Sequence, residues 1–104
     1  MAGPVDRVLS EDVPGAPDDV RAHYVDLNNI AVPSAGPVLT HARQFPVVRL
    51  DSVVTFDPIP DGTRLTERIR FTAPWPLLSV TVRQAVEAHK EMLSGIRRHF
   101  EALG

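Results

Sequence analysis

Cysteine is absent from the 104-residue chain. Disulfide bonds, thiolate metal sites and cysteine catalysis are therefore excluded. An excess of positive charge is also lacking, because 13 acidic residues outnumber 11 basic ones and leave a formal net charge of −2. Without a basic patch, nucleic acid and anionic membrane surfaces are not expected as partners.

Long hydrophobic runs are lacking as well. No segment approaches the length of a membrane span, and acidic residues stand near the N-terminus where a signal peptide needs a basic start and an apolar run. We therefore expect no membrane insertion and a cytoplasmic location. The length suffices for one modest hydrophobic core, so residues 1–104 are predicted to form a single domain.

The last third of the chain has the pattern of one long amphipathic helix, from Leu77 to Leu103, after Pro74-Trp75-Pro76. Its apolar side chains recur at spacings of three or four, which places them on one helix face. This predicted stripe consists of Leu78, Val82, Ala85, His89, Met92, Ile96, Phe100 and Leu103. At about 1.5 Å per residue the helix would span roughly 40 Å, so we expect a wide sheet beneath it.

Two segments before the helix alternate with period two and are rich in β-branched residues, which predicts a hairpin with strands at 47–57 and 63–73. Proline and glycine in residues 58–62 provide the turn chemistry. Matching the apolar faces leaves two registers, in which Phe56 lies opposite either Thr63 or Leu65. Glu67 then faces either Ser52 or Val54.

The first part of the chain predicts a weak strand over residues 5–13 and a short helix from Pro17 to about Leu27. Two carboxylates after Pro17 suit a helix N-terminus, and Asn28 and Asn29 are plausible terminators. The apolar stripe of this helix consists of Val20, Tyr24 and Leu27. A loop over residues 28–37 should follow, and then a third strand over residues 38–45.

Three sequence motifs and the order of these elements resemble the START-like, or SRPBCC, superfamily, in particular its polyketide cyclase/dehydratase-like branch. The motifs are Pro-x-x-Pro-Asp-Asp-Val at 14–20, Val-Val-Thr-Phe-Asp-Pro at 53–58 and Asp-Gly-Thr-Arg-Leu-Thr at 61–66. The resemblance covers nearly the whole chain and implies an α+β helix-grip fold, in which a curved antiparallel sheet packs on the long C-terminal helix. It also implies binding of hydrophobic small molecules such as lipids, sterols or polyketides; some members are cyclases or dehydratases.

The chain departs from that family in one respect, because members commonly carry extra strands between the short helix and the strand that starts here at Val38. A shortened sheet of this kind would leave strand edges unpaired, which favours pairing with another chain. We therefore expect a homodimer. The alternative to a ligand-binding protein is an interaction or dimerisation module with a filled interior and no ligand.

Glu67 and His89 are the candidate catalytic residues. Strand parity places Glu67 on the apolar face, where it is either desolvated and able to exchange protons, or solvated near an open mouth. His89 either polarises a bound carbonyl and pairs with Glu67, or is an ordinary core histidine.

The predicted ligand-binding residues are Ser52, Val54, Trp75, Ala85 and Met92. The hydroxyl of Ser52 can bond a ligand or a neighbouring carbonyl, and Trp75 can line a pocket entrance or anchor the helix. No histidine and carboxylate set has metal-ligand spacing, and no cofactor is predicted. The leading hypothesis is therefore binding of a lipid- or polyketide-like molecule between sheet and helix, with cyclase- or dehydratase-type chemistry if any reaction occurs.

Overall fold

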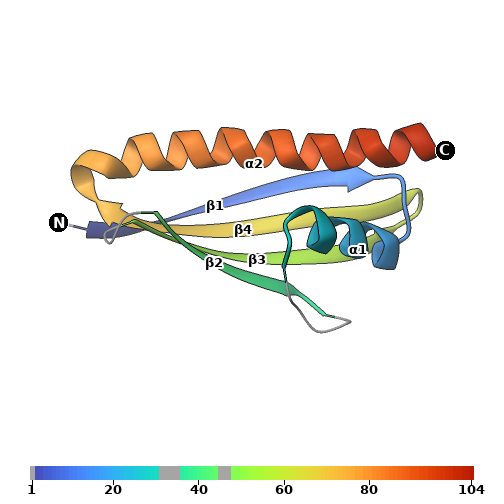
Figure 1. Cartoon of the computed structure of the whole chain (residues 1–104), viewed down its shortest axis with the longest axis horizontal. Helices are drawn as coiled ribbons and strands as arrows, with labels where there is room; N and C mark the ends of the chain where they lie inside the picture. The colour runs from blue at the N-terminus through green and yellow to red at the C-terminus, as the bar shows by residue number, and fades with distance from the viewer. Residues whose placement is uncertain (1, 31–35, 45–47) are drawn as a thin grey trace.

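The computed structural model describes residues 2–30, 36–44 and 48–104. The elements follow one another as β1 (Ala2–Val13), α1 (Pro17–Leu27), β2 (Val38–Gln44), β3 (Val48–Ile59), β4 (Gly62–Pro74) and α2 (Trp75–Leu103) (Figure 1). This order confirms the predicted arrangement of a strand, a short helix, three consecutive strands and a long helix. Phe45 and Val47, the expected ends of two strands, lie outside the described residues.

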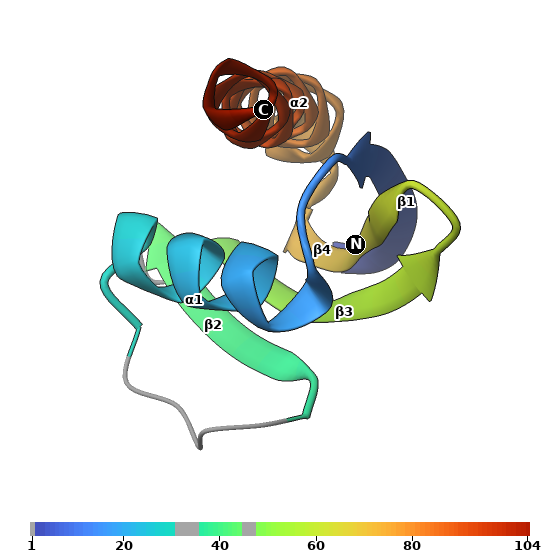
Figure 2. The same ribbon diagram turned by 90° about the vertical axis from the view of Figure 1, so that its right-hand side faces the viewer.

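The four strands form one antiparallel open sheet in the order β1-β4-β3-β2. Both helices lie on the same face of it, α2 against β1 and β4, and α1 mainly against β3 (Figure 2). We call this helix-covered face the inner face. Buried and exposed residues alternate along β4, as expected when one face is covered by helices and the other meets water. The protein is therefore α+β, with one sheet and helices on one side.

The hairpin of β3 and β4 adopts the second of the two predicted registers. Phe56 lies opposite Leu65, and Val54 lies opposite Glu67. The strands extend further than predicted, to the pair Ile59 and Gly62, so that only two residues form the turn. A side chain at Gly62 would place its Cβ 2.1 Å from the backbone oxygen of Val13, which explains the glycine.

Helix α1 has the predicted bounds and stops at the predicted residues. Asn28 is the C-cap, and Asn29 has a positive φ of 53°, as expected at a helix end. Val20 and Tyr24 are buried, but Leu27 is 54% exposed, so its place in the predicted apolar stripe is wrong. Leu27 belongs to the last turn, immediately before the chain leaves the helix.

Helix α2 begins at Trp75, two residues earlier than predicted, with Pro76 in the first turn, where its missing N–H costs little. Leu78, Val82, Ile96 and Phe100 are buried as expected. Leu103 is 69% exposed because the end of α2 extends beyond the strands (Figure 1). Leu93 is 1% exposed and was not part of the predicted stripe. Leu93 fits the same spacing, because it lies four residues after His89 and three before Ile96, and it is more buried than its neighbour Met92.

Two hydrophobic clusters fill the inner face. One lies beneath α1 and the C-terminal half of α2, and consists of Val13, Val20, Tyr24, Val38, Val54, Leu65, Leu93, Ile96 and Phe100. The other lies beneath the first half of α2, and consists of Val48, Leu50, Ile69, Phe71, Ala73, Leu78 and Val82. In β4, Leu65 belongs to the first cluster and Ile69 to the second. Glu67 therefore lies at the junction between them.

Among the described residues, no helix combines the length and apolar character needed to cross a membrane.

Candidate functional site

Glu67 is completely buried, with no exposed surface. Its position in β4, two residues from both Leu65 and Ile69, directs its side chain to the inner face. The alternative in which this carboxylate is solvated near an open mouth is therefore wrong. A carboxylate in such a place is costly unless other groups donate hydrogen bonds to it.

Two side chains supply those hydrogen bonds, one to each carboxylate oxygen of Glu67. The Tyr24 hydroxyl, from α1, donates to Oε2 at 2.8 Å. His89, from α2, bonds Oε1 through Nδ1. Among the residues described, no buried side-chain nitrogen or oxygen lacks a hydrogen-bond partner. Three elements thus converge on one buried carboxylate, and we call this set the Tyr24–Glu67–His89 chain.

The protonation states in this chain follow from its geometry. Hydrogen bonding to Glu67 raises the pKa of His89, and this outweighs the opposing effect of burial. Burial raises the pKa of Tyr24, and the nearby Glu67 raises it further, so the phenol keeps its proton and remains a donor. His89 therefore carries its positive charge to higher pH than an ordinary histidine does.

His89 also reaches a groove on the inner face, between α2 and the start of β3. The groove has a volume of about 460 Å³ and is lined by Val48, Leu50, Leu77, Val80, Thr81, Gln84, Ala85, Ala88 and His89. We call it the His89 groove. The His89 side chain is 28% exposed. Because Nδ1 is bonded to Glu67, Nε2 is the ring nitrogen that remains available to a molecule in the groove.

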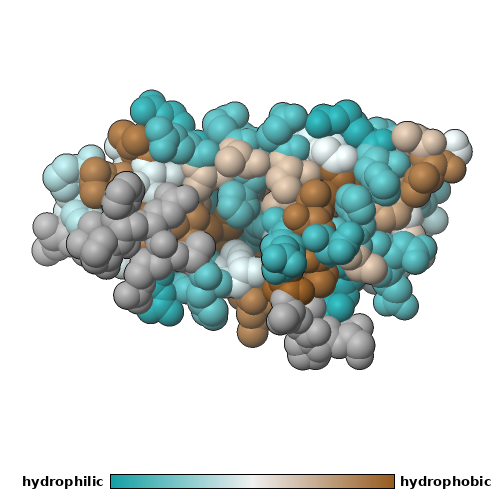
Figure 3. All heavy atoms as spheres, in the orientation of Figure 1, coloured by the Kyte–Doolittle hydropathy of each residue, from teal (hydrophilic) through white to brown (hydrophobic). Residues whose placement is uncertain are grey.

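The walls of the His89 groove are largely apolar. Val48 and Leu50 of β3 are almost fully buried, whereas Leu77 and Val80 of α2 are 44% and 41% exposed. Figure 3 shows hydrophilic side chains along the outer side of α2 and hydrophobic atoms beneath it. The groove exists because α1 covers the other end of β3 and leaves its first residues without a second helix (Figure 1). Sites for small molecules have this character, with apolar walls and few polar groups.

The structure brings together some of the predicted site residues and separates the others. Ala85 lines the groove beside His89, and Glu67 lies behind His89. Val54 has no exposed surface and belongs to the core beneath α1. Ser52 is also buried, and its hydroxyl is hydrogen-bonded to the hydroxyl of Thr40 in β2.

The two remaining predicted ligand contacts lie away from the His89 groove. Met92 is half-buried, packs against the cluster beneath α1, and its sulfur lies 3.8 Å from Nδ2 of Asn28. Trp75 is 63% exposed and lines a different groove, between α2 and β1. Of the five predicted ligand-binding residues, Ala85 is the one that lines the His89 groove.

Tyr24 is the member of the chain that the sequence pattern does not identify, because its spacing places it in the apolar stripe of α1. The available signal was its hydroxyl. A buried tyrosine usually needs a hydrogen-bond partner, and a carboxylate on the inner face needs donors. The two needs together point to contact between Tyr24 and Glu67.

No protein-family model matches the sequence, and no curated protein gives a significant match.

Proposed function

We propose that the protein binds a hydrophobic small molecule in the His89 groove and that His89 contacts an oxygen atom of this ligand. The observation that carries the proposal is the Tyr24–Glu67–His89 chain, which joins a fully buried carboxylate to an imidazole at the wall of an apolar groove. The volume of about 460 Å³ lies in the range of small-molecule sites.

The buried charge itself supports a role beyond folding. Replacing a buried ion pair by apolar residues is often neutral or stabilising, so such a pair is weak evidence for stability alone. Perturbed titratable groups beside a cleft are instead common at functional sites. His89 fits that description, because its pKa is raised by Glu67 and its ring lines the groove.

The chemistry that His89 can serve depends on its protonation state. As an imidazolium, it donates a hydrogen bond from Nε2 and stabilises negative charge on a ligand carbonyl or carboxylate oxygen. When neutral, with Nδ1–H held by Glu67, it presents a lone pair at Nε2 and can accept a proton. Enolisation, aldol-type cyclisation and dehydration are the reactions that this proton exchange would assist.

We further propose that the chain is a shortened START-like domain with a helix-grip arrangement. The support is the order of elements, the antiparallel sheet and the long helix across its inner face. A lipid- or polyketide-like carbonyl compound is the ligand class that this relationship favours, and the polyketide cyclase-like branch performs the reaction types named above.

A matched pair of probes tests the proposal. 2-Acetylnaphthalene has a carbonyl oxygen, whereas 2-ethylnaphthalene has a similar shape without it. We expect both to shift the backbone amide resonances of Ala85 and Ala88 in NMR titrations, with the ketone binding more tightly. His89→Gln should remove the advantage of the ketone, and His99→Gln, an exposed position on the same helix, should retain it.

Two outcomes would contradict this proposal. One is the absence of saturable shifts along the groove with either probe. The other is an unchanged preference for the ketone in His89→Gln, provided that the variant folds normally by circular dichroism. In that second case the groove would bind apolar molecules without help from the Tyr24–Glu67–His89 chain.

A second candidate function is association with another copy through the free edge of β2. Among the described strands, β2 pairs only with β3, and apolar side chains are exposed on the outer face near this edge, with Leu39 at 60% and Val53 at 38%. Sheet pairing should yield a dimer in sedimentation velocity that Leu39→Lys weakens. A monomer at every concentration would exclude this candidate.

A further inference from the structure

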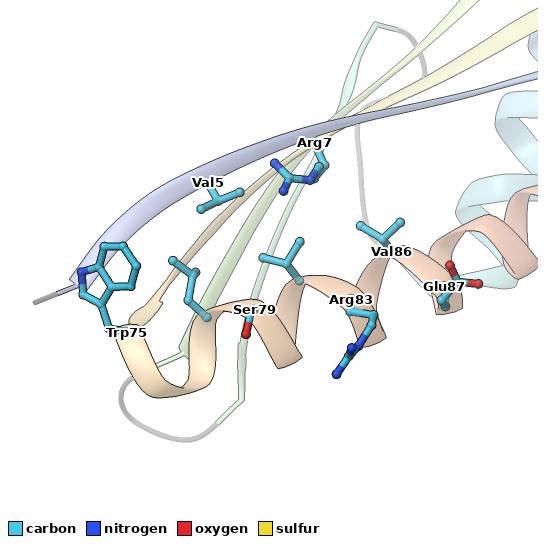
Figure 4. A pocket seen from close by; sticks show the side chains of 9 residues that line it. Val5, Arg7, Trp75, Ser79, Arg83, Val86 and Glu87 are labelled. Carbon is cyan, nitrogen blue, oxygen red and sulfur yellow. The ribbon is translucent and has the colours of Figure 1, made fainter.

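A second groove lies on the other side of α2, between the start of this helix and β1 (Figure 4). Its volume is about 510 Å³. Trp75 stands at one end, and Val5 of β1 lies across from the helix (Figure 4). Leu78, Val82 and Val86 of α2 complete the apolar part of its lining. We call it the Trp75 groove, and the described residues that line it are all different from those that line the His89 groove.

Arg7 is the unexpected residue in the Trp75 groove. It occupies an inner-face position of β1, between Val5 and Leu9, where alternation favours an apolar side chain. Figure 4 shows its side chain between β1 and α2, extending toward Val5. A guanidinium is thus held beside an apolar surface.

Arg7 has no carboxylate partner among the described residues, since its one hydrogen bond goes from Nη1 to the backbone oxygen of Asp6 at 2.9 Å. Arginines on the outer face of the neighbouring strand β4 differ in this respect. Arg70 pairs with the carboxylate of Asp6 at 3.0 Å, and Arg64 pairs with Asp12 at 2.9 Å. The Asp6 carboxylate is therefore engaged on the opposite face of the sheet from Arg7.

The other charged groups that line the groove are not paired with Arg7, so its guanidinium is available to a ligand. Of the described residues that line the groove, Glu87 alone carries a carboxylate, and this lies 3.8 Å from the ammonium group of Lys90. Arg83 points away from β1 in Figure 4. The groove thus combines an apolar floor, an exposed indole and a guanidinium without an acidic partner.

We propose that the Trp75 groove is a separate binding site for an amphipathic carboxylate, with the anionic group on Arg7 and the apolar chain against Trp75, Val5 and Leu78. A guanidinium matches a carboxylate with two parallel hydrogen bonds. The apolar wall accommodates the chain by burying its surface. This site lies across α2 from the His89 groove and does not depend on it.

Octanoate is the probe for this site, and the intrinsic fluorescence of Trp75 is the readout. Trp75 is the only tryptophan of the chain, so its emission reports the Trp75 groove directly. We expect a saturable change in emission with octanoate and a weaker response to octan-1-ol, which has the same chain length and no charge. Because the contact with Arg7 is charge-assisted, Arg7→Gln should raise the Kd for octanoate about tenfold.

Arg68→Gln is the matched control, because Arg68 is an exposed strand arginine on the outer face of the sheet. This variant should bind octanoate as the wild type does, and Arg7→Gln should bind octan-1-ol as the wild type does. His89→Gln should also leave the octanoate titration unchanged, which separates the two grooves.

Three results would overturn this inference. They are no saturable change of Trp75 emission with octanoate, an unchanged Kd in a folded Arg7→Gln variant, and equal losses in Arg7→Gln and Arg68→Gln. The last result would mean that the affinity for octanoate depends on the net charge of the protein and not on Arg7.

Discussion

The two ends of the inner face use the same strands and the same long helix, yet one end is closed and the other is grooved. Beneath α1, side chains from all four strands and both helices form a continuous buried cluster. At the start of β3, the floor residues Val48 and Leu50 are buried, but Leu77 and Val80 of α2 remain about two-fifths exposed. The difference between the ends is the presence of a second helix.

This contrast shows why an alternating strand pattern alone does not distinguish a core from a binding groove. Leu50 and Val54 follow the same parity in β3, and only Val54 lies under α1. Glu67 lies where the closed and the grooved ends meet. The Tyr24–Glu67–His89 chain therefore links α1, on the closed side, to a histidine that faces the groove.

Removal of the Glu67 carboxylate should have the largest effect on stability. Glu67→Ala leaves the Tyr24 hydroxyl and the His89 imidazole without their acceptor, and removing one partner of a buried pair typically costs about 3–5 kcal/mol. Urea unfolding followed by circular dichroism measures this loss.

A triple replacement sharpens the same test. Glu67→Met with Tyr24→Phe and His89→Leu removes the whole chain and leaves no polar group unpaired. Stability should recover to near the wild-type value, while the preference for 2-acetylnaphthalene over 2-ethylnaphthalene is lost. If the single variant were as stable as the wild type, Glu67 would not be a buried hydrogen-bonded carboxylate.

Truncation of one leucine at each end of α2 tests the contrast directly. Leu93 is 1% exposed on the closed side, and Leu93→Ala should cost about 2–5 kcal/mol. Leu77 is 44% exposed beside the groove, and Leu77→Ala should change stability by about 0.5 kcal/mol or less. Similar losses in chemical denaturation would show that the groove end is packed as tightly as the closed end.

Filling each end with a larger side chain gives a further comparison. Val38→Phe should destabilise by about 1–3 kcal/mol, because Val38 is fully buried in the cluster beneath α1. Ala88→Phe should leave stability nearly unchanged, since Ala88 is exposed and lines the groove, and it should abolish binding of 2-acetylnaphthalene. Normal binding by a folded Ala88→Phe variant would place the ligand elsewhere.

The smallest expected effect is a change in how the stability of the protein depends on pH. Replacing His89 and replacing His23 should change this dependence in opposite directions. The pKa of His89 is raised above 6.5 by its hydrogen bond to Glu67. Its contribution is therefore fully present below pH 6.5 and is lost as the pH rises through the raised pKa. His89→Gln should lose more stability on the acid side than on the alkaline side.

His23, on the closed side, stacks on His99 with ring centroids 4.1 Å apart. Burial lowers its pKa below 6.5, and His99 lowers it further. A histidine with a lowered folded-state pKa destabilises the protein as the pH falls below 6.5, so His23→Gln should reduce that acid-side loss. Denaturation curves at several pH values measure both effects. If the free energy of unfolding changed with pH in the same way in the His89→Gln and His23→Gln variants, the pKa directions of the two histidines would be contradicted.

Much of the fold follows from local patterns in the sequence. Period-two alternation identifies the hairpin strands, and the carboxylates after Pro17 together with Asn28 and Asn29 mark both ends of α1. The side of the sheet occupied by Glu67 follows from the same parity. Alternation alone does not fix the register of the hairpin, because both alternatives match apolar faces. The two-residue turn at Pro60 and Asp61 selects one of them.

The site was predictable only in part, because its geometry depends on contacts between distant elements. Tyr24 and Glu67 are separated by 43 positions, and no local period relates them. Leu103 lies where α2 extends beyond the strands, and Leu27 lies in the last turn of α1, so periodicity overestimates the burial of both. Val54 and Ser52 share the inward parity of groove residues but lie beneath α1 or bond to β2.

The most direct test of the Tyr24–Glu67–His89 chain is nitrogen-15 NMR of the His89 imidazole with and without 2-acetylnaphthalene. We expect Nδ1 to remain protonated and bonded to Glu67 in both states, and the resonance of Nε2 to shift on binding. An Nε2 resonance that does not respond to a saturating ketone, or a Nδ1 that loses its proton while Nε2 keeps one, would contradict the proposed role of His89.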